Sequence, residues 1–315
     1  MSLLLEHHGL KLSEPMVFGL SGAMSFAFLP FLKMGNLPVV AYRMFPGHII
    51  KKLPKKLGIK PFRKRYRYQD QAMRELDAFL ADGQIVGIQT SAYYTTYFPP
   101  DMRFQFNAHN SIVFGKQGEE YLISDPVFEM PQRIHASDLE KARFAKGFSA
   151  PKGLVHFPRS VPDRIDLEPL IRKSIKKTVN MMLHAPPYIG LKGIRQLAKH
   201  ILHLPRKRNK VYTRHFLGNL VRMQEEIGTG GGGFRFIYAA FLQEAYQVLG
   251  LPLLSEASRK MTEAGDTWRE YALACAKSVK QKNGNTDLPL IAGLLRRCAD
   301  AEKEVYVKLK DLKRH

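Results

Sequence analysis

The spacing of apolar residues changes near residue 165, and no other feature limits the fold of this chain as strongly. Beyond that point apolar residues recur every three or four positions, for example at Ile171, Ile175 and Val179. This is the period of one face of an α-helix, and no later segment indicates a strand. We therefore expect residues 161–315 to form an all-α domain.

The first 160 residues instead mix helical and strand patterns. Residues 69–82 have the pattern of an amphipathic helix, and residues 22–29 and 37–44 read as strands separated by a Gly-Asn turn. Four more segments have strand character: 84–90, 104–115, 119–125 and 153–157. We expect an α+β fold, with a mixed domain over residues 1–160 and a boundary within 158–165, where two prolines bracket a short polar link.

The chain is strongly basic, because 49 lysines and arginines outnumber 28 aspartates and glutamates and give a net charge of +21. Such a surface attracts anionic partners, which include nucleic acid, membranes, phosphorylated ligands and acidic proteins. Basic clusters lie at 51–56, 62–68 and 206–210, and Tyr66 and Tyr68 are available to stack on bases. Charge alone does not choose among these partners, and ordinary solvated charge is the alternative for each cluster.

Only two cysteines occur, Cys275 and Cys298, and both lie within helical patterns. This excludes a disulfide framework and a CxxC metal cluster and fits a reducing compartment. We predict neither a metal site nor a cofactor. The longest apolar run, residues 19–32, is too short to cross a bilayer, and the first residues lack a signal-peptide pattern. We therefore expect a cytoplasmic protein without a membrane span.

A row of polar residues beside a histidine marks the hairpin at residues 104–125. Alternation along its first strand predicts a core face and a polar face: Phe104, Phe106, Ile112 and Phe114 on one, and Gln105, Asn107, His109 and Ser111 on the other. A three-residue loop, 116–118, ends in the glycine that a G1 bulge needs. That register pairs His109 with Asp125, whereas a two-residue loop would place Asp125 opposite Asn110.

These two residues carry half the chemistry of a thiol-type catalytic site. Opposed residues have Cβ atoms roughly 4.5 to 5.5 Å apart, so Asp125 can hold one nitrogen of the His109 imidazole and fix its tautomer. The histidine can then withdraw the proton of a cysteine and later return it to a leaving group. The cysteine itself is missing beside them. A histidine with only a structural hydrogen bond is the alternative.

Three segments carry a resemblance to a known family: LLLEHHGLKLSEPMVFGL at 3–20, FNAHNSIVFG with ISDP at 106–126, and GTGGGGFRFIYAAFLQEA at 228–245. They resemble the acyltransferases related to butirosin biosynthesis protein H. The resemblance implies a papain-like (cysteine-peptidase-like) α/β domain followed by a helical domain. It also implies small-molecule biosynthesis in which an acyl group passes from a carrier-protein thioester to an amine through an acyl-cysteine.

By this resemblance His109 and Asp125 match the base and its orienting residue, and the partners are an acidic acyl carrier protein and a small-molecule amine. The family cysteine belongs to a His-Cys motif at the start of the helix whose second half is LLLEHHG here, so we expect it just upstream of Met1. Residues 2–9 read as the back half of a helix without a capping residue. Either Met1 is an internal methionine of a longer protein or the chain has lost its nucleophile. In both cases we expect the chain as given to be inactive.

The glycine run at 228–233 matches the dinucleotide pattern GxGxxG, but a helical segment precedes it where that site needs a strand. A flexible loop between helices is one interpretation. The other is an anion site at the N-terminus of the next helix, formed by Gly230, Gly231, Gly232 and Arg235 and able to contact the phosphate of a phosphopantetheine arm.

Two other functions remain open from the sequence. A noncatalytic basic protein would bind nucleic acid or an acidic protein, and the family reading makes nucleic acid the less favoured partner. A cysteine-peptidase-like hydrolase would use the same thiol, histidine and aspartate with water as acceptor. Tyr93, Tyr94 and Tyr97 lie in a loop where they can line a cleft or simply pack, and we assign them no role. The pattern around Cys275 indicates a small core residue and not a substitute nucleophile.

Overall fold

The computed structural model describes all residues except 46, 205–208, 228–229, 282–285 and 314–315. The chain forms two compact units. The first consists of Met1–Ser13 with Pro46–Ile165, and the second consists of Glu14–Phe45 with Asp166–His315. The first unit is mixed and the second is mainly helical, as the sequence predicts. The two units differ from the predicted division at residues 160 and 161, because residues 14–45 belong with the helices.

The first unit is built on a six-stranded antiparallel sheet in the order β3-β8-β4-β5-β6-β7. Its strands are β3 (Lys60–Lys64), β4 (Val86–Thr90), β5 (His109–Gln117), β6 (Glu120–Ser124), β7 (Gln132–His135) and β8 (Val155–Ser160). Its helices are α1 (Ser2–His7), α3 (Gly47–Lys56), α4 (Gln69–Ala81) and α5 (Ala136–Arg143). The sequence missed β3 and β7, which are short strands at the two edges of the sheet.

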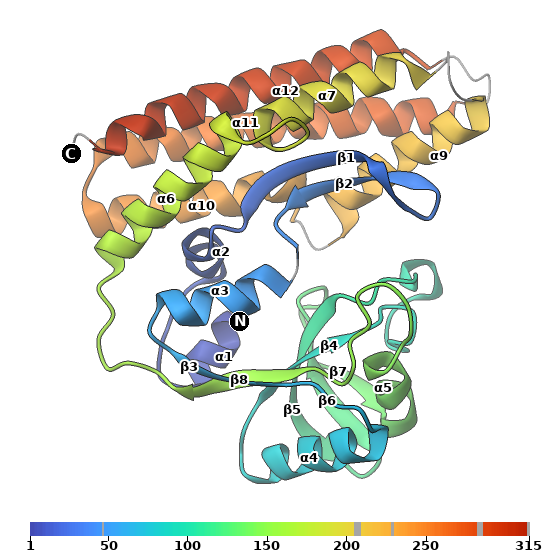
Figure 1. Cartoon of the computed structure of the whole chain (residues 1–315), viewed down its shortest axis with the longest axis vertical. Coiled ribbons are helices and arrows are strands. Elements are labelled where there is room, and N and C mark those ends of the chain that lie inside the picture. Colours follow the sequence, from blue (N-terminus) through green and yellow to red (C-terminus); the bar gives the residue numbers. More distant parts are fainter. Residues whose placement is uncertain (46, 205–208, 228–229, 282–285, 314–315) are drawn as a thin grey trace. The chain divides into compact units, whose positions relative to one another are not determined.

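One face of this sheet carries the core of the unit. Ala72 and Leu76 of α4 and Leu139 of α5 pack with Ile88 and Val113, which project from the central strands β4 and β5. All five side chains are at most 1% exposed. Figure 1 shows α4 and α5 beside the strands. Burial of these side chains fixes which face of β4 and β5 points inward, and thereby places the residues farther along the same face.

The second unit contains a two-stranded antiparallel hairpin, β1 (Met24–Met34) and β2 (Leu37–Arg43). Gly35 and Asn36 have φ angles of 57° and 66°, so the predicted Gly-Asn turn is confirmed and has the left-handed geometry that a tight hairpin requires. Phe26 of β1 lies 5.7 Å, ring centre to ring centre, from Trp268. Contacts of this kind explain why the hairpin belongs to the helical unit.

The helices of the second unit follow the predicted periodicity. They are α2 (Glu14–Ser21), α6 (Leu167–His184), α7 (Gly190–Leu202), α9 (Lys210–Val221), α10 (Arg235–Leu249), α11 (Pro252–Lys280) and α12 (Leu288–Leu309). Asp166 caps α6 through a side-chain hydrogen bond to Glu168 N–H. Among the described residues, no helix combines the length and apolar character needed to cross a membrane.

Candidate functional site

The β5–β6 hairpin has a different turn from the one that the sequence predicts. Gln117 pairs with Glu120, so the loop contains two residues and not three. Val113 pairs with Ile123 and Gly115 with Leu122, which leaves Phe114 as an extra residue in β5. This bulge shifts the register by one residue. The predicted three-residue loop is therefore wrong.

The shifted register changes how the histidine and the aspartate meet. Ile112 pairs with Ser124, so the next pair along this register joins Ser111 to Asp125. His109 lies two residues farther along β5, diagonal to the aspartate on the same face of the sheet. A diagonal pair is within reach of long side chains. The contact that the sequence predicts is present, but its geometry is diagonal and not directly opposed.

The predicted core face and polar face along β5 are only partly confirmed, because Ile112 is buried as predicted but Phe114 is not. Residues 104–108 lie outside the strand, which begins at His109. Phe114, predicted in the core, is 38% exposed, whereas Val113 is fully buried. Because His109 and Ser111 share the face of Val113, they continue the buried face and not a solvated one. The histidine therefore sits at the end of the core, where water has little access.

Asp125 is the most heavily bonded residue of this site. Its Oδ2 atom lies 2.5 Å from His109 Nε2, with the aspartate side chain fully buried and the histidine side chain 12% exposed. The hydroxyl of Tyr97 donates to the same oxygen at 2.8 Å. The backbone N–H of Val127 donates to Oδ1 at 3.0 Å. Three donors thus converge on one buried carboxylate.

These contacts decide the charge of the carboxylate. Burial alone raises the pKa of Asp125, but the hydrogen bonds and charge of His109, the Val127 N–H and the Tyr97 hydroxyl outweigh burial and lower it. The group is therefore an ionised acceptor at neutral pH. Burial, and then the charge of Asp125, raise the pKa of Tyr97, so its hydroxyl stays protonated and donates.

An ionised carboxylate only accepts hydrogen bonds, so His109 must carry a proton on Nε2. In the neutral imidazole this leaves the lone pair on Nδ1. The Phe98 ring packs against the imidazole in a T-shaped contact, 5.3 Å from centre to centre. The arrangement holds a histidine in one tautomer with one nitrogen free for proton transfer.

Tyr97 is the residue of this site to which the sequence assigned no role. It lies between β4 and β5, and its ring contacts Phe98 and Phe128. The neighbouring Tyr93 and Tyr94 are 48% and 38% exposed, and their rings contact each other in a T-shaped arrangement. The sequence does show three tyrosines in the loop that precedes the strand of His109. It does not show which of the three contacts Asp125.

Neither cysteine lies in this unit. Cys275 is in α11 and Cys298 is in α12, and both are fully buried. Burial raises the pKa of the Cys275 thiol to about 12 and raises that of Cys298 well above its usual range. A buried thiol with a raised pKa supplies almost no thiolate, so neither residue is suited to be a nucleophile.

The structure does not support the predicted anion site at the glycine run. The backbone N–H of Gly232 donates to the carboxylate of Glu225, at 3.1 Å from Oε1, so a carboxylate of the chain itself occupies this amide. Residues 228 and 229 lie outside the described residues. Gly230 and Gly231, at the N-terminal side of Gly232, have φ angles of 61° and 87°. The Gly232 amide is therefore already paired within the chain and is not free to bind a phosphate.

Arg235, the predicted phosphate contact, lies inside the helical unit with a fully buried side chain. Its Nε donates to Glu302 at 2.9 Å, and Nη1 donates to the carbonyl oxygen of Gly233 at 2.6 Å. The guanidinium carbon lies 4.6 Å from the centre of the Trp268 ring. These contacts leave the guanidinium no exposed atom to offer a phosphate. Local sequence gave no sign of Glu302, which lies 67 positions away.

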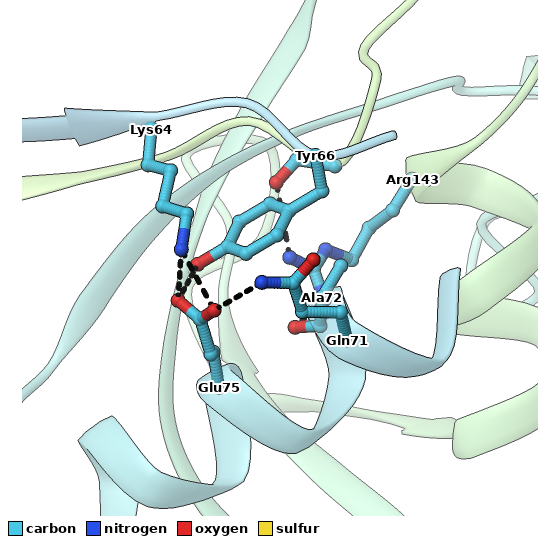
Figure 2. A network of polar contacts seen from close by, with 7 residues as sticks. Lys64, Tyr66, Gln71, Ala72, Glu75 and Arg143 are labelled. Carbon is cyan, nitrogen blue, oxygen red and sulfur yellow. Dashed lines mark hydrogen bonds and ion pairs between the residues drawn. The ribbon is translucent and has the colours of Figure 1, made fainter. Parts of the chain in front are cut away.

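Part of the basic cluster at 62–68 is bound within the chain. Lys64 and Tyr66 both donate to the Glu75 carboxylate at 2.7 Å, and Gln71 donates to it at 2.9 Å (Figure 2). Tyr66 is 5% exposed, so it is not available to stack on a base, whereas Tyr68 is 61% exposed. The cluster is thus partly a structural network. Residues 206–208 of the third cluster lie outside the described residues.

Arg143, behind this network, is fully buried. It donates to the carbonyl oxygens of Ala72 and Gly153, both at 3.1 Å. Burial lowers its pKa to about 10. The arginine therefore ties α4 to the segment that precedes β8.

Two family models match the chain. The N-terminal domain of butirosin biosynthesis protein H matches residues 1–126, and this range contains both His109 and Asp125. A domain of unknown function, DUF4872, matches residues 137–309. No curated protein matches the chain. The two matches together cover nearly the whole sequence, and the chain therefore belongs to the family that joins a butirosin biosynthesis protein H N-terminal domain to a DUF4872 domain.

Proposed function

We propose that this chain is a member of the cysteine-dependent acyltransferases, in which His109 is the general base and Asp125 orients it. The observation that carries the proposal is the His109–Asp125 contact, which leaves Nδ1 as the free nitrogen. Membership of a family named for butirosin biosynthesis supports a biosynthetic role. We further propose a papain-like arrangement for the first unit, supported by its antiparallel sheet and the histidine at the start of β5.

The proposed reaction has two stages. In the first, His109 Nδ1 takes the proton of a cysteine thiol, and the sulfur attacks the thioester carbonyl of an acidic carrier protein. The carrier thiolate leaves and takes that proton, and the acyl group stays on the cysteine. In the second, an amine of a small molecule attacks the acyl-cysteine and loses a proton to His109, which returns it to the departing cysteine sulfur.

The nucleophilic cysteine of this proposal is neither Cys275 nor Cys298, which are buried in α11 and α12. We propose, from the family resemblance, that it belongs to a His-Cys motif ahead of Met1. The chain as given would then supply the base, its orienting carboxylate and the helical unit, and it would form no acyl-enzyme. A cytoplasmic location is part of the same proposal.

The test uses protein made with the in-frame codons upstream of Met1 included, incubated with a carrier protein loaded with a labelled acyl group. We expect intact-mass spectrometry to show one acyl group on the protein, and His109→Asn to abolish the label. His135→Asn is the matched control, because His135 is exposed and caps α5, and asparagine is also a good helix cap. Stop codons throughout the upstream sequence, or labelling that survives His109→Asn, would contradict the proposal. Release of free acid without an amine acceptor would indicate a hydrolase.

A further inference from the structure

The Asp125 carboxylate is held unequally at its two oxygens. Oδ1 accepts from the N–H of Val127, which lies only two residues away, in a turn that Phe128 N–H closes on the Asp125 carbonyl oxygen at 3.1 Å. Oδ2 accepts from His109 at 2.5 Å and from the Tyr97 hydroxyl at 2.8 Å. Tyr97 is therefore a second distant donor to the oxygen that holds the histidine, and it reaches this oxygen from 28 positions away.

The ring of Tyr97 is fixed independently of its hydroxyl. Its centre lies 5.2 Å from that of Phe98 and 5.8 Å from that of Phe128. The loop is tied by Thr95, whose hydroxyl donates to the Ala92 carbonyl oxygen at 2.8 Å. It is also tied by Arg103, whose Nε donates to the Phe98 carbonyl oxygen at 2.7 Å. These contacts hold the Tyr97 ring, and with it the hydroxyl, in position next to Asp125.

The Tyr97 hydroxyl affects the orientation of the His109 imidazole through the Asp125 carboxylate. The torsion that orients an aspartate carboxylate is broad, so one short-range bond to Val127 does not define the plane of the group. A second donor on Oδ2 defines that plane, and with it the direction in which Oδ2 accepts the His109 Nε2 proton. Fixing this acceptor fixes the imidazole tautomer and the direction of Nδ1.

We infer that Tyr97 is a positioning residue of the site, whose hydroxyl fixes the Asp125 carboxylate so that His109 keeps its proton on Nε2 and presents Nδ1. What Nδ1 does rests on the proposed function. The positioning does not, because it concerns only the carboxylate and the imidazole.

The first test uses the chain as given. Nuclear magnetic resonance of the nitrogen-15-labelled protein measures how fast the His109 Nε2 proton exchanges with solvent. The hydrogen bond from this proton to the fixed Asp125 carboxylate slows the exchange. Hydrogen bonds to charged groups contribute about 1.5 to 3 kcal/mol, which corresponds to a factor of about ten to one hundred. We expect Tyr97→Phe, which keeps the ring and removes the donor, to speed this exchange by about that factor. Unchanged exchange would overturn the inference.

Tyr94→Phe is the matched control, because Tyr94 lies in the same loop and is 38% exposed. We expect it to leave the His109 signal as in the parent protein. An equal effect of both variants would show a general loosening of the loop, and it would also overturn the inference. If Tyr97→Phe does not fold, the Tyr97 hydroxyl proton of the parent protein supplies a second measurement. Held on Asp125 Oδ2 at 2.8 Å, it should exchange slowly with solvent, and a hydroxyl proton that exchanges as fast as that of Tyr94 would overturn the inference.

The acyl-transfer assay separates the two proposals. With the upstream residues included, Tyr97→Phe should lower kcat about tenfold or more and alter its pH profile while KM changes little. If exchange responds to Tyr97→Phe but no acyl group is ever taken up, the positioning holds and the proposed function fails. If acyl uptake requires His109 while exchange ignores Tyr97→Phe, the proposed function holds and the positioning fails.

Discussion

Removing the charge of Glu302 should destabilise the helical unit by several kcal/mol. Its carboxylate is fully buried, and Oε1 accepts from Arg235 Nε at 2.9 Å and from Trp268 Nε1 at 2.6 Å. In Glu302→Gln the Arg235 guanidinium stays buried without a counter-charge. Breaking a buried pair in this way costs about 3 to 5 kcal/mol. For a unit of this size each kcal/mol lowers Tm by about 2 to 4 °C, so the expected loss is roughly 6 to 20 °C.

The assay is thermal unfolding followed by far-ultraviolet circular dichroism, with fluorescence of Trp268, the one tryptophan of the chain, as a local probe. Asp300→Asn is the matched control, because Asp300 lies on the same helix, α12, and pairs with Arg195 at 2.6 Å while its side chain is 61% exposed. An exposed pair contributes at most about 1 kcal/mol. Equal losses of Tm in the two variants would refute the reasoning. The double variant Arg235→Met with Glu302→Leu should regain much of the stability, because it removes both buried charges together.

Three further predictions follow from buried groups. Since burial raises the pKa of Cys275 to about 12, iodoacetamide at pH 8 should leave it unmodified in the folded protein and alkylate it in urea, and peptide mass mapping distinguishes the two states. His156 has its pKa lowered to about 3, chiefly by burial, so it stays neutral in the fold while the unfolded chain binds a proton below about pH 6.5. Stability should therefore fall by about 2 kcal/mol between pH 7 and pH 5 in urea titrations, and His156→Gln should lose this share of the pH dependence. Gly87→Ala would place a Cβ atom 2.3 Å from His156 Cε1 and should lower the free energy of unfolding by about 1 to 3 kcal/mol. Gly115→Ala would place its Cβ atom 3.2 Å from Leu122 and should lower it less. Chemical denaturation of the two variants measures both losses.

The local sequence was sufficient to predict those helices and turns whose conformation is determined by residues within the element itself. The helix at 69–82 appears as α4, because Ala72 and Leu76 lie on one face and are both fully buried. The Gly-Asn turn appears at Gly35 and Asn36, which supply the positive φ angles themselves. In each case the information lies within a few residues of the feature, so periodicity and turn chemistry read it directly.

The rest depended on partners distant in sequence. Ile112, Val113 and Phe114 are all apolar, so alternation could not say which one the bulge would leave outside. The contact of His109 with Asp125 was foreseen, because a hairpin joins them, but Tyr97 reaches the same carboxylate from 28 positions away. Arg235 looked like an exposed phosphate ligand because its partner, Glu302, lies on another helix.

The assignment of Glu14–Phe45 to the helical unit has a consequence for anyone who divides this protein. The chain passes between its two units at residues 13–14, 45–46 and 165–166, so neither unit is one continuous piece of polypeptide. A fragment that starts at residue 161 would leave behind Phe26 and Tyr42, whose rings contact Trp268. To obtain the helical unit alone, a gene would have to join residues 14–45 to residues 166–315 through a new linker. In such a molecule the hairpin β1–β2 would stay with the helices against which it packs, and the segments of the first unit would be removed from both sides of it.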